Sequence, residues 1–236
     1  MGTAFSTIIT QHAMNFIEDP RWQEQLALNP AQFFRAKSLI LENAIPRFNR
    51  PYNIQQYLTY SKEAYGDYEY AIDADMEEEQ DIVIDTGLTG YELCSTGILT
   101  SNGKEAPTYT PVANQYDAET GAVTVTAELK AGQSILCDFY TDGVFDRDLD
   151  MTQCRILGLC MACDWHRQFA NAYLNVANLV IDKTFNVRSA SEHMRVNTER
   201  LRTLEQMLSQ ELLAYEQKLY ALKYVNGVIF PTPFGM

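Results

Sequence analysis

The hydrophobic period of the chain changes within residues 137–181, and this change most constrains the fold. Apolar residues alternate up to Phe139, as in a β-strand, and residues 140–143 then supply turn chemistry. A long apolar stretch follows Asp150, which is suited to be an N-cap, with Gln153 placed to complete a capping box. The sequence therefore predicts that a β-rich region ends here and a long helix begins.

This predicted helix is apolar on nearly every side between Cys154 and Cys163. A helix without a polar face must be covered by other elements on several sides. We therefore expect it to be the central helix of a bundle, or to lie between its own domain and a neighbouring subunit.

Helical patterns also occupy the N-terminal part of the chain. Residues 3–17 have apolar side chains at helical spacing, and residues 22–28 add a further short helical segment. Asn29 followed by Pro30 is typical of an N-cap and the first helical position, and the helix that they begin stops before Pro46.

Short strand-like segments, separated by glycine and proline turns, characterise residues 66–148. Residues 116–121 favour a hairpin turn, and the even spacing of strands and turns indicates an antiparallel sandwich or barrel. The predicted strands are Tyr68–Ile72, Asp81–Asp85, Glu92–Ser95, Val112–Asn114, Ala122–Ala127 and Ser134–Phe139.

A second long helix is expected to end at about Tyr224, and it carries a continuous apolar stripe. The short connection before it favours antiparallel pairing with the helix over residues 150–181. The stripe consists of Met194, Leu201, Leu204, Leu208, Leu212, Tyr215, Leu219 and Leu222.

The predicted fold class is α+β: a helical bundle formed by both chain ends, with an inserted antiparallel β-domain like a sandwich or barrel. Residues 1–65 would supply the N-terminal helices and residues 66–148 the β-domain. Residues 149–225 would form the long helical hairpin that completes the helical domain, and residues 226–236 a C-terminal interaction tail.

Charge and cysteine content limit the classes of function. The net charge of −13 argues against binding of duplex DNA through its phosphates. The five cysteines are odd in number and irregularly spaced, which favours free thiols and a reducing compartment during synthesis. The sequence has no run long enough for a membrane span and no signal-peptide pattern, so we expect a cytosolic protein when it is made.

Two metal-binding hypotheses are weak. The Cys160-x-x-Cys163-x-x-His166 motif does not bring all three side chains to one face of a helix, and structural zinc needs four converging ligands. The aspartates between residues 138 and 150 miss the EF-hand pattern, and turns and caps explain Asp142, Asp148 and Asp150. We therefore expect no metal and no cofactor.

No catalytic motif is present in the sequence. His12, His166 and His193 fall in three separate helical segments, with no serine or cysteine motif beside them. We expect a protein that is not an enzyme.

Several segments resemble neck proteins of tailed phages, the head–tail connectors or adaptors that form a ring beneath the portal. These are residues 43–51 (NAIPRFNRP), residues 138–145 (DFYTDGVF), and residues 182–185 (DKTF) followed by residues 197–201 (NTERL). Adaptors of this family are mainly small helical bundles, so the β-domain departs from them. The resemblance therefore leaves open an adaptor, a neighbouring neck protein or another tail component.

The resemblance implies a structural virion protein without catalytic residues, made in the host cytoplasm and built into the neck or tail region. It implies a homo-oligomeric ring, commonly of twelve subunits, that lies coaxially with the portal and encloses the DNA channel. Its partners would be the portal protein and a tail-completion or other neck protein, and DNA would pass through without specific binding.

Two sets of residues are candidates for contacts in such an assembly. The apolar C-terminal tail would reach a neighbouring subunit or the portal, or fold back onto its own subunit, and an acidic triplet would repel DNA in the channel. The tail candidates are Val228, Ile229, Phe230 and Phe234, and the channel candidates are Glu77, Glu78 and Glu79.

The alternative function is a ligand- or carbohydrate-binding module of a phage tail or surface assembly. In that case Tyr91, Tyr109 and Tyr116 would form an aromatic platform on the β-domain.

Overall fold

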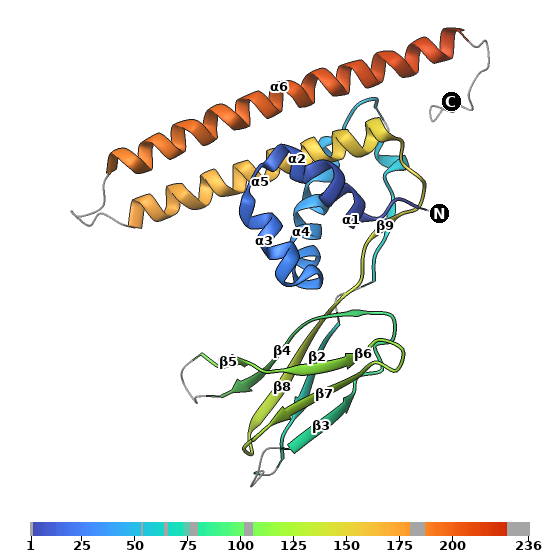
Figure 1. The fold of residues 1–236 in the computed structure, drawn as a ribbon. Helices are drawn as coiled ribbons and strands as arrows, with labels where there is room; N and C mark the ends of the chain where they lie inside the picture. The colour runs from blue at the N-terminus through green and yellow to red at the C-terminus, as the bar shows by residue number, and fades with distance from the viewer. Residues whose placement is uncertain are drawn as a thin grey trace. The chain divides into compact units, whose positions relative to one another are not determined.

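The computed structural model describes residues 2–52, 54–63, 66–73, 75, 80–101, 106–179 and 187–225, with the backbone alone for residues 169–179, 187–194 and 222–225. The chain divides into two compact units (Figure 1). The helical unit comprises Met1–Pro20, Lys37–Ser61 and Gly143–Met236, and the β-unit comprises Arg21–Ala36 and Lys62–Asp142.

The helical unit begins with three continuous helical segments and ends with two long helices. The chain leaves the first segments at Glu18, whose φ of 53° is left-handed. The bounds are α1 (Phe5–Ile8), the π-helical η1 (Ile9–Ala13), α2 (Met14–Ile17), the 3₁₀ turns η2 (Ile45–Arg47) and η3 (Ile54–Tyr57), β1 (Tyr60–Ser61), β9 (Val144–Phe145), α5 (Met151–Leu179) and α6 (Val187–Val225).

Helix α5 starts where the sequence predicted, and the predicted capping box is confirmed. The Gln153 backbone N–H donates to Asp150 Oδ1 at 2.8 Å, and the Asp150 N–H donates to Gln153 Oε1 at 2.8 Å. Its apolar turns are covered by α1, η1 and α2 and by α6, so Ile156 and its neighbours are buried. Gly158 permits the close approach of η1, because a Cβ there would lie 2.7 Å from His12 Cβ.

Helix α6 packs antiparallel to α5, as predicted. Gln153 Nε2 donates to Tyr215 Oη at 2.9 Å, and Arg155 Nε donates to Glu211 Oε1 at 3.0 Å. The middle of the predicted stripe is buried; its members are Leu204, Leu208, Leu212 and Tyr215. Leu219 continues the stripe but is 37% exposed, since it lies beyond the level of Gln153 near the start of α5. The side chains of Met194 and Leu222 lie outside the described residues.

The β-unit contains two antiparallel sheets that share one core. Their strand orders are β2-β8-β4-β5 and β3-β7-β6. The core is formed by Ile72, Ile82, Ile84, Val123, Val125, Ala127, Leu129, Ile135, Cys137 and Phe139. The strands are β2 (Asp67–Ala71), β3 (Gln80–Asp85), β4 (Glu92–Thr100), β5 (Thr108–Pro111), β6 (Asn114–Asp117), β7 (Ala122–Ala127) and β8 (Gln133–Tyr140).

The strand predictions hold for five segments and fail for one. Residues 112–114 were predicted as a strand, but strand β5 ends at Pro111 and β6 begins at Asn114. The predicted hairpin turn joins β6 to β7: Asp117 accepts bonds from the Glu119 N–H and the Thr120 hydroxyl, and Gly121 has a φ of 74°.

The predicted fold class is wrong in its account of the helices, which are not formed by both chain ends as one bundle. In its described part the structure is α+β with three antiparallel sheets, but α3 (Pro20–Leu28) and the first half of α4 (Pro30–Ala44) belong largely with the β-strands. The reason is apolar packing within the β-unit: Phe34 stacks on Tyr140 with ring centroids 6.3 Å apart, and Ala31 packs with Cys94. At the other end, residues 226–236 lie outside the described residues.

The sequence predicts that residues 66–148 form a β-domain that folds independently, and this stays a prediction. The expected closeness of the two ends of the β-region is seen in the backbone pairing. The Phe139 N–H donates to Gly66 O at 2.8 Å, and Tyr60 of β1 pairs with Phe145 of β9.

Candidate functional site

The outer face of α6 is the first candidate surface, and it lies opposite the stripe that packs on α5. Between Thr203 and Ala221 all of its side chains are exposed and none is charged, although the exposed Arg202 and Lys218 border it and the chain as a whole is strongly acidic. We define this outer face as Thr203, Gln206, Gln210, Leu213, Ala214, Gln217, Tyr220 and Ala221. It combines long polar amide groups with two large apolar side chains, Leu213 (45% exposed) and Tyr220 (47% exposed).

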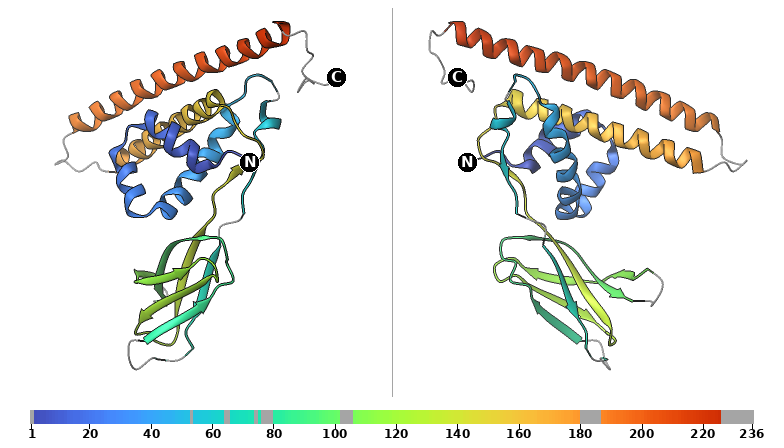
Figure 2. Two further views of the ribbon diagram at one scale, coloured as in Figure 1. Left: turned by 45° about the vertical axis from the view of Figure 1, so that its right-hand side comes forward. Right: turned by 180° about the vertical axis from the view of Figure 1, so that it is seen from behind.

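Helix α6 also runs past the start of α5 (Figures 1 and 2). Tyr215 is level with Gln153, and the helix continues to Val225, about 15 Å further at the usual rise per residue. Leu219 is therefore exposed in the line of the buried stripe.

Charged pairs hold the two long helices in place. Arg167 Nη2 donates to Glu205 Oε1 at 2.5 Å, and Arg47 forms an ion pair with Asp164. Burial raises the pKa of Asp164 above its usual value, and the Arg47 charge opposes that shift. These pairs position the helices, while the outer face of α6 takes no part in them.

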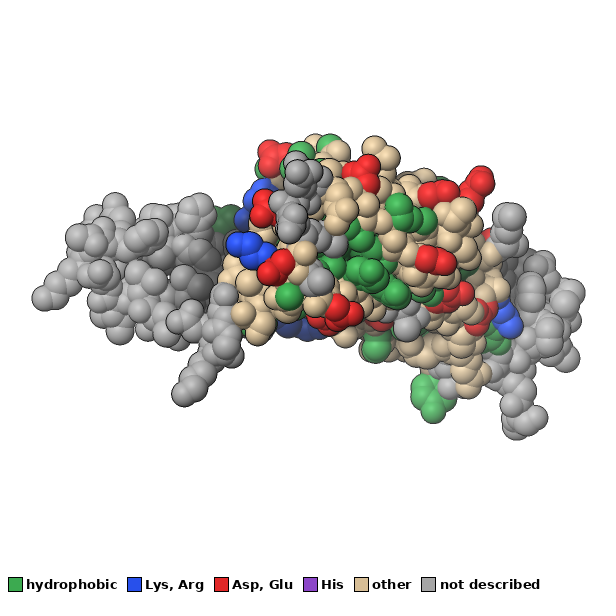
Figure 3. All heavy atoms as spheres, turned by 90° about the horizontal axis from the view of Figure 1, so that it is seen from below, with side chains coloured by type: hydrophobic (Ala, Val, Ile, Leu, Met, Phe, Trp, Pro, Cys, Tyr) green, Lys and Arg blue, Asp and Glu red, His purple; other side chains and the backbone are tan. Residues whose placement is uncertain are grey.

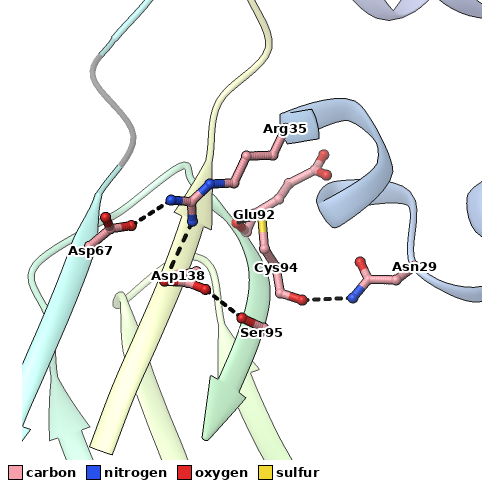
Figure 4. A network of polar contacts seen from close by, with 7 residues as sticks. All are labelled: Asn29, Arg35, Asp67, Glu92, Cys94, Ser95 and Asp138. Atoms are coloured by element: carbon pink, nitrogen blue, oxygen red, sulfur yellow. Dashed lines mark hydrogen bonds and ion pairs between the residues drawn. The ribbon is translucent and has the colours of Figure 1, made fainter. Parts of the chain in front are cut away.

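A polar network lies in the β-unit, where α4 meets strands β2, β4 and β8 (Figure 4). Arg35 Nη2 donates to Asp67 Oδ1 at 2.8 Å, and its Nη1 lies 3.6 Å from Asp138 Oδ1. The Ser95 hydroxyl donates to Asp138 Oδ2 at 2.6 Å. Arg35 of α4 thus links α4 to strands β2 and β8 through one aspartate on each strand.

Next to this network is a shallow cleft of about 450 Å³ that is broadly open to solvent. The segment between α3 and α4, the start of β4 and strand β6 surround it. Its lining includes Asn29, Tyr91, Glu92, Cys94, Asn114 and Tyr116.

Asn29 connects two elements that line the cleft, the start of α4 and strand β4. Its Oδ1 accepts the Gln32 backbone N–H at 3.0 Å, which confirms the predicted N-cap, and its Nδ2 donates to the Cys94 carbonyl at 2.6 Å (Figure 4). The same side chain therefore starts α4 and ties it to the first half of β4.

The structure brings together two of the three predicted platform tyrosines. Tyr91 and Tyr116 line the cleft, and both rings pack against Phe139, with centroid distances of 6.5 Å and 5.4 Å. Tyr109 does not line it: its ring lies over Gly97, where a Cβ would be 2.4 Å from Tyr109 Cζ.

The other candidate residues divide into those that the structure places and those that it does not. The tail residues Val228, Ile229, Phe230 and Phe234 and the acidic residues Glu77, Glu78 and Glu79 lie outside the described residues. All five cysteines are free and buried.

The structure bears on both metal hypotheses within its described part. There, no group of three or more potential ligands is placed to hold a metal ion. Individual aspartates of the 138–150 region have other partners: Asp142 accepts from the Tyr140 hydroxyl at 2.8 Å, and Asp146 accepts from the Ser61 hydroxyl at 3.1 Å. His166 Nδ1 lies 2.9 Å from Asn197 Oδ1 on α6.

Sequence reasoning missed Asn114, Glu92 and the second role of Asn29. Asn29 was recognisable only as a cap, because its partner Cys94 lies 65 residues away. Asn114 and Glu92 carried no local signal, since each is an ordinary exposed residue at the beginning of a strand.

Comparisons with known proteins identify no relative: no model of a protein family, no curated protein and no solved structure matches this chain. In the described residues, no helix is both long enough and apolar enough to cross a membrane.

Proposed function

We propose that this protein is a structural subunit of a tailed-phage neck, a head–tail connector that joins the portal to the tail and lines the DNA channel as a homo-oligomeric ring. The observation that carries the proposal is the uncharged outer face of α6 on a chain with a net charge of −13. The type of assembly is inferred from the segments that resemble neck proteins. These are residues 43–51, 138–145, 182–185 and 197–201.

The occupant of the outer face in this proposal is a second copy of the chain. Two strongly acidic subunits repel each other over most of their surfaces, so they associate best where neither presents a charge. Protein interfaces are also depleted of charged residues at their centres and enriched in tyrosine. Leu213 and Tyr220 provide apolar anchors there, and the glutamines provide hydrogen bonds at low cost.

The outer face of α6 is too small to form the subunit interface by itself. At about 28 Å by about 10 Å it is smaller than the roughly 800 Å² that each partner buries in a standard interface. The remaining area would come from the part of α6 beyond Tyr215 and from the tail candidates Val228, Ile229, Phe230 and Phe234. Such a ring would also contact the portal protein and a tail-completion or other neck protein.

Acidic side chains fit a channel through which DNA slides. They are spread over the face of the molecule shown in Figure 3, with apolar side chains between them. Acidic groups repel phosphates, so they favour passage over binding. In this proposal Glu77, Glu78 and Glu79 contribute to that repulsion.

Mass photometry and negative-stain imaging of the full chain test the proposal. The parent should form a ring with a central hole, and Leu213→Glu should reduce it to monomers because it places a like charge on the outer face. Leu28→Glu is the matched control: Leu28 is 85% exposed on α3, and its replacement should leave the ring intact. A parent that stays monomeric at micromolar concentration, or an L213E ring, would contradict the proposal.

A further inference from the structure

The cleft of the β-unit has the volume of a ligand site, is broadly open to solvent, and is bordered by hydrogen-bonded side chains. Its volume of about 450 Å³ lies within the usual ~300–1,000 Å³ of small-molecule sites. Asn29 fixes one wall through its bond to Cys94 O. The Tyr116 hydroxyl fixes another part of the lining through contacts with Leu88 O at 2.9 Å and Tyr91 O at 3.0 Å. A ligand would therefore find its walls already ordered, which lowers the entropic cost of binding.

The lining combines aromatic rings with uncharged and acidic hydrogen-bonding groups. Tyr91 and Tyr116 are half-buried, whereas the side chains of Glu92 and Asn114 are exposed at the rim. A carboxylate accepts hydrogen bonds from hydroxyl groups, and an amide both donates and accepts. Amphipathic tyrosine rings suit a ligand that has an apolar face and a polar edge.

The charge of the lining selects among such ligands. No lysine or arginine lines the cleft, and Arg35, which lies close to Cys94, is engaged by Asp67 and Asp138. Phosphorylated, sulfated and uronic ligands would meet Glu92 with no compensating positive charge. The ligand should therefore carry no net negative charge, and the uncharged polar groups of Asn29, Asn114 and the tyrosines suit a neutral one.

We propose that this cleft binds a neutral saccharide unit of a glycan, held by Tyr91 and Tyr116 through the sugar's C–H face and by Glu92 and Asn114 through its hydroxyl groups. Binding of this kind goes beyond a structural role in a neck ring, and it needs only the β-unit. The two proposals can therefore fail separately. A ring that binds no sugar would contradict only the sugar site, and a sugar-binding protein that forms no ring would contradict only the neck ring.

Saturation-transfer difference NMR on the full chain tests the proposal. The probes are neutral oligosaccharides of glucose, galactose, mannose and N-acetylglucosamine, with an oligogalacturonate as the anionic comparison. At least one neutral probe should receive saturation at millimolar concentration, and the oligogalacturonate should receive none.

Variants locate the binding in the cleft. Tyr91→Ala and Asn114→Ala should each weaken binding about tenfold or more, the range of a contact that anchors a ligand. Tyr109→Ala is the matched control, because Tyr109 is an exposed tyrosine of the same unit outside the cleft. Asn114 is exposed, so its replacement tests the site without threatening the fold.

The proposal is overturned if no neutral probe binds, if the oligogalacturonate binds more tightly than every neutral probe, or if Tyr109→Ala weakens binding as much as Asn114→Ala.

Discussion

His166 makes the stability of the packing between α5 and α6 depend on pH. It is buried on α5 and contacts Asn197 on α6 through Nδ1, and its Nε2 and Asn197 Nδ2 are buried without a hydrogen-bond partner among the described residues. Burial lowers the pKa of His166 below its usual value. The Arg200 charge acts in the same direction, whereas Asn197, Glu18 and Asp19 oppose it. The folded protein therefore favours the neutral imidazole.

This arrangement predicts that the helical unit loses stability in mild acid. A histidine whose pKa is lowered by folding binds more protons when unfolded, so stability is full above about pH 6.5 and falls as pH drops below that value. His12 acts in the same direction, because burial and the Arg155 charge lower its pKa. Urea unfolding followed by circular dichroism between pH 7.5 and pH 5.5 measures the slope.

The matched variant is His166→Gln, which removes the titrating group and keeps a hydrogen-bonding side chain. It should show a shallower loss of stability than the parent over the same pH range. A parent that is equally stable at both ends of the range would refute this prediction.

The cysteine thiols should be unreactive in the folded protein. Burial raises the pKa of Cys94 and Cys137 to about 11, and that of Cys163 to about 12. Alkylating reagents attack the thiolate, so a shift from 9 to about 11 reduces reactivity about 100-fold at pH 8. Mass spectrometry after iodoacetamide treatment should show little modification without denaturant and five modifications with it. Rapid modification of Cys160 or Cys163 in the native protein would mean that α5 is not covered.

Among the elements, helices α5 and α6 depend on one buried seam. Leu208 is buried against α5, whereas Leu213 lies on the outer face of α6 and is 45% exposed. Leu208→Ala should lower the free energy of unfolding by about 2–5 kcal/mol, the usual cost of emptying a leucine site in a core. Leu213→Ala is the matched control and should change it by less than about 0.5 kcal/mol when measured on monomer. Equal effects of the two substitutions would refute the assigned faces of α6.

The capping box makes a second prediction for α5. Asp150→Ala removes the acceptor of the Gln153 N–H and should destabilise the protein by about 1 kcal/mol. Asp150→Asn is the matched variant, because asparagine caps helices nearly as well and should restore most of the loss. Thermal melts of the three proteins measure both changes, and a D150N protein as unstable as D150A would show that charge, not capping, matters.

For the whole molecule, net charge dominates the expected behaviour towards nucleic acid. With a net charge of −13, the full chain should not bind duplex DNA tightly even at low ionic strength. Fluorescence anisotropy with a labelled duplex measures this at several salt concentrations. Tight binding that weakens steeply with salt would contradict both this prediction and a channel through which DNA slides.

Much of the fold follows from local patterns. The strand Ala122–Ala127 lies where alternation predicted it, α5 begins at the predicted capping box, and α4 begins at Pro30 after its predicted cap. These features depend on residues within a few positions of one another, so the sequence alone determines them. The stripe Leu204, Leu208, Leu212 and Tyr215 likewise predicted which face of α6 is buried.

Only the tertiary structure decided which apolar face meets which partner. An amphipathic helix has an apolar side wherever it packs, so no local pattern could assign Ala31 and Phe34 to Cys94 and Tyr140 of the strands. The cleft is likewise assembled from segments around residues 29, 92 and 115, which only chain folding brings together. The outer face of α6 became a candidate surface for the same reason. Its exposure follows from where α5 and the N-terminal helices pack, which is a property of the whole chain and not of α6 itself.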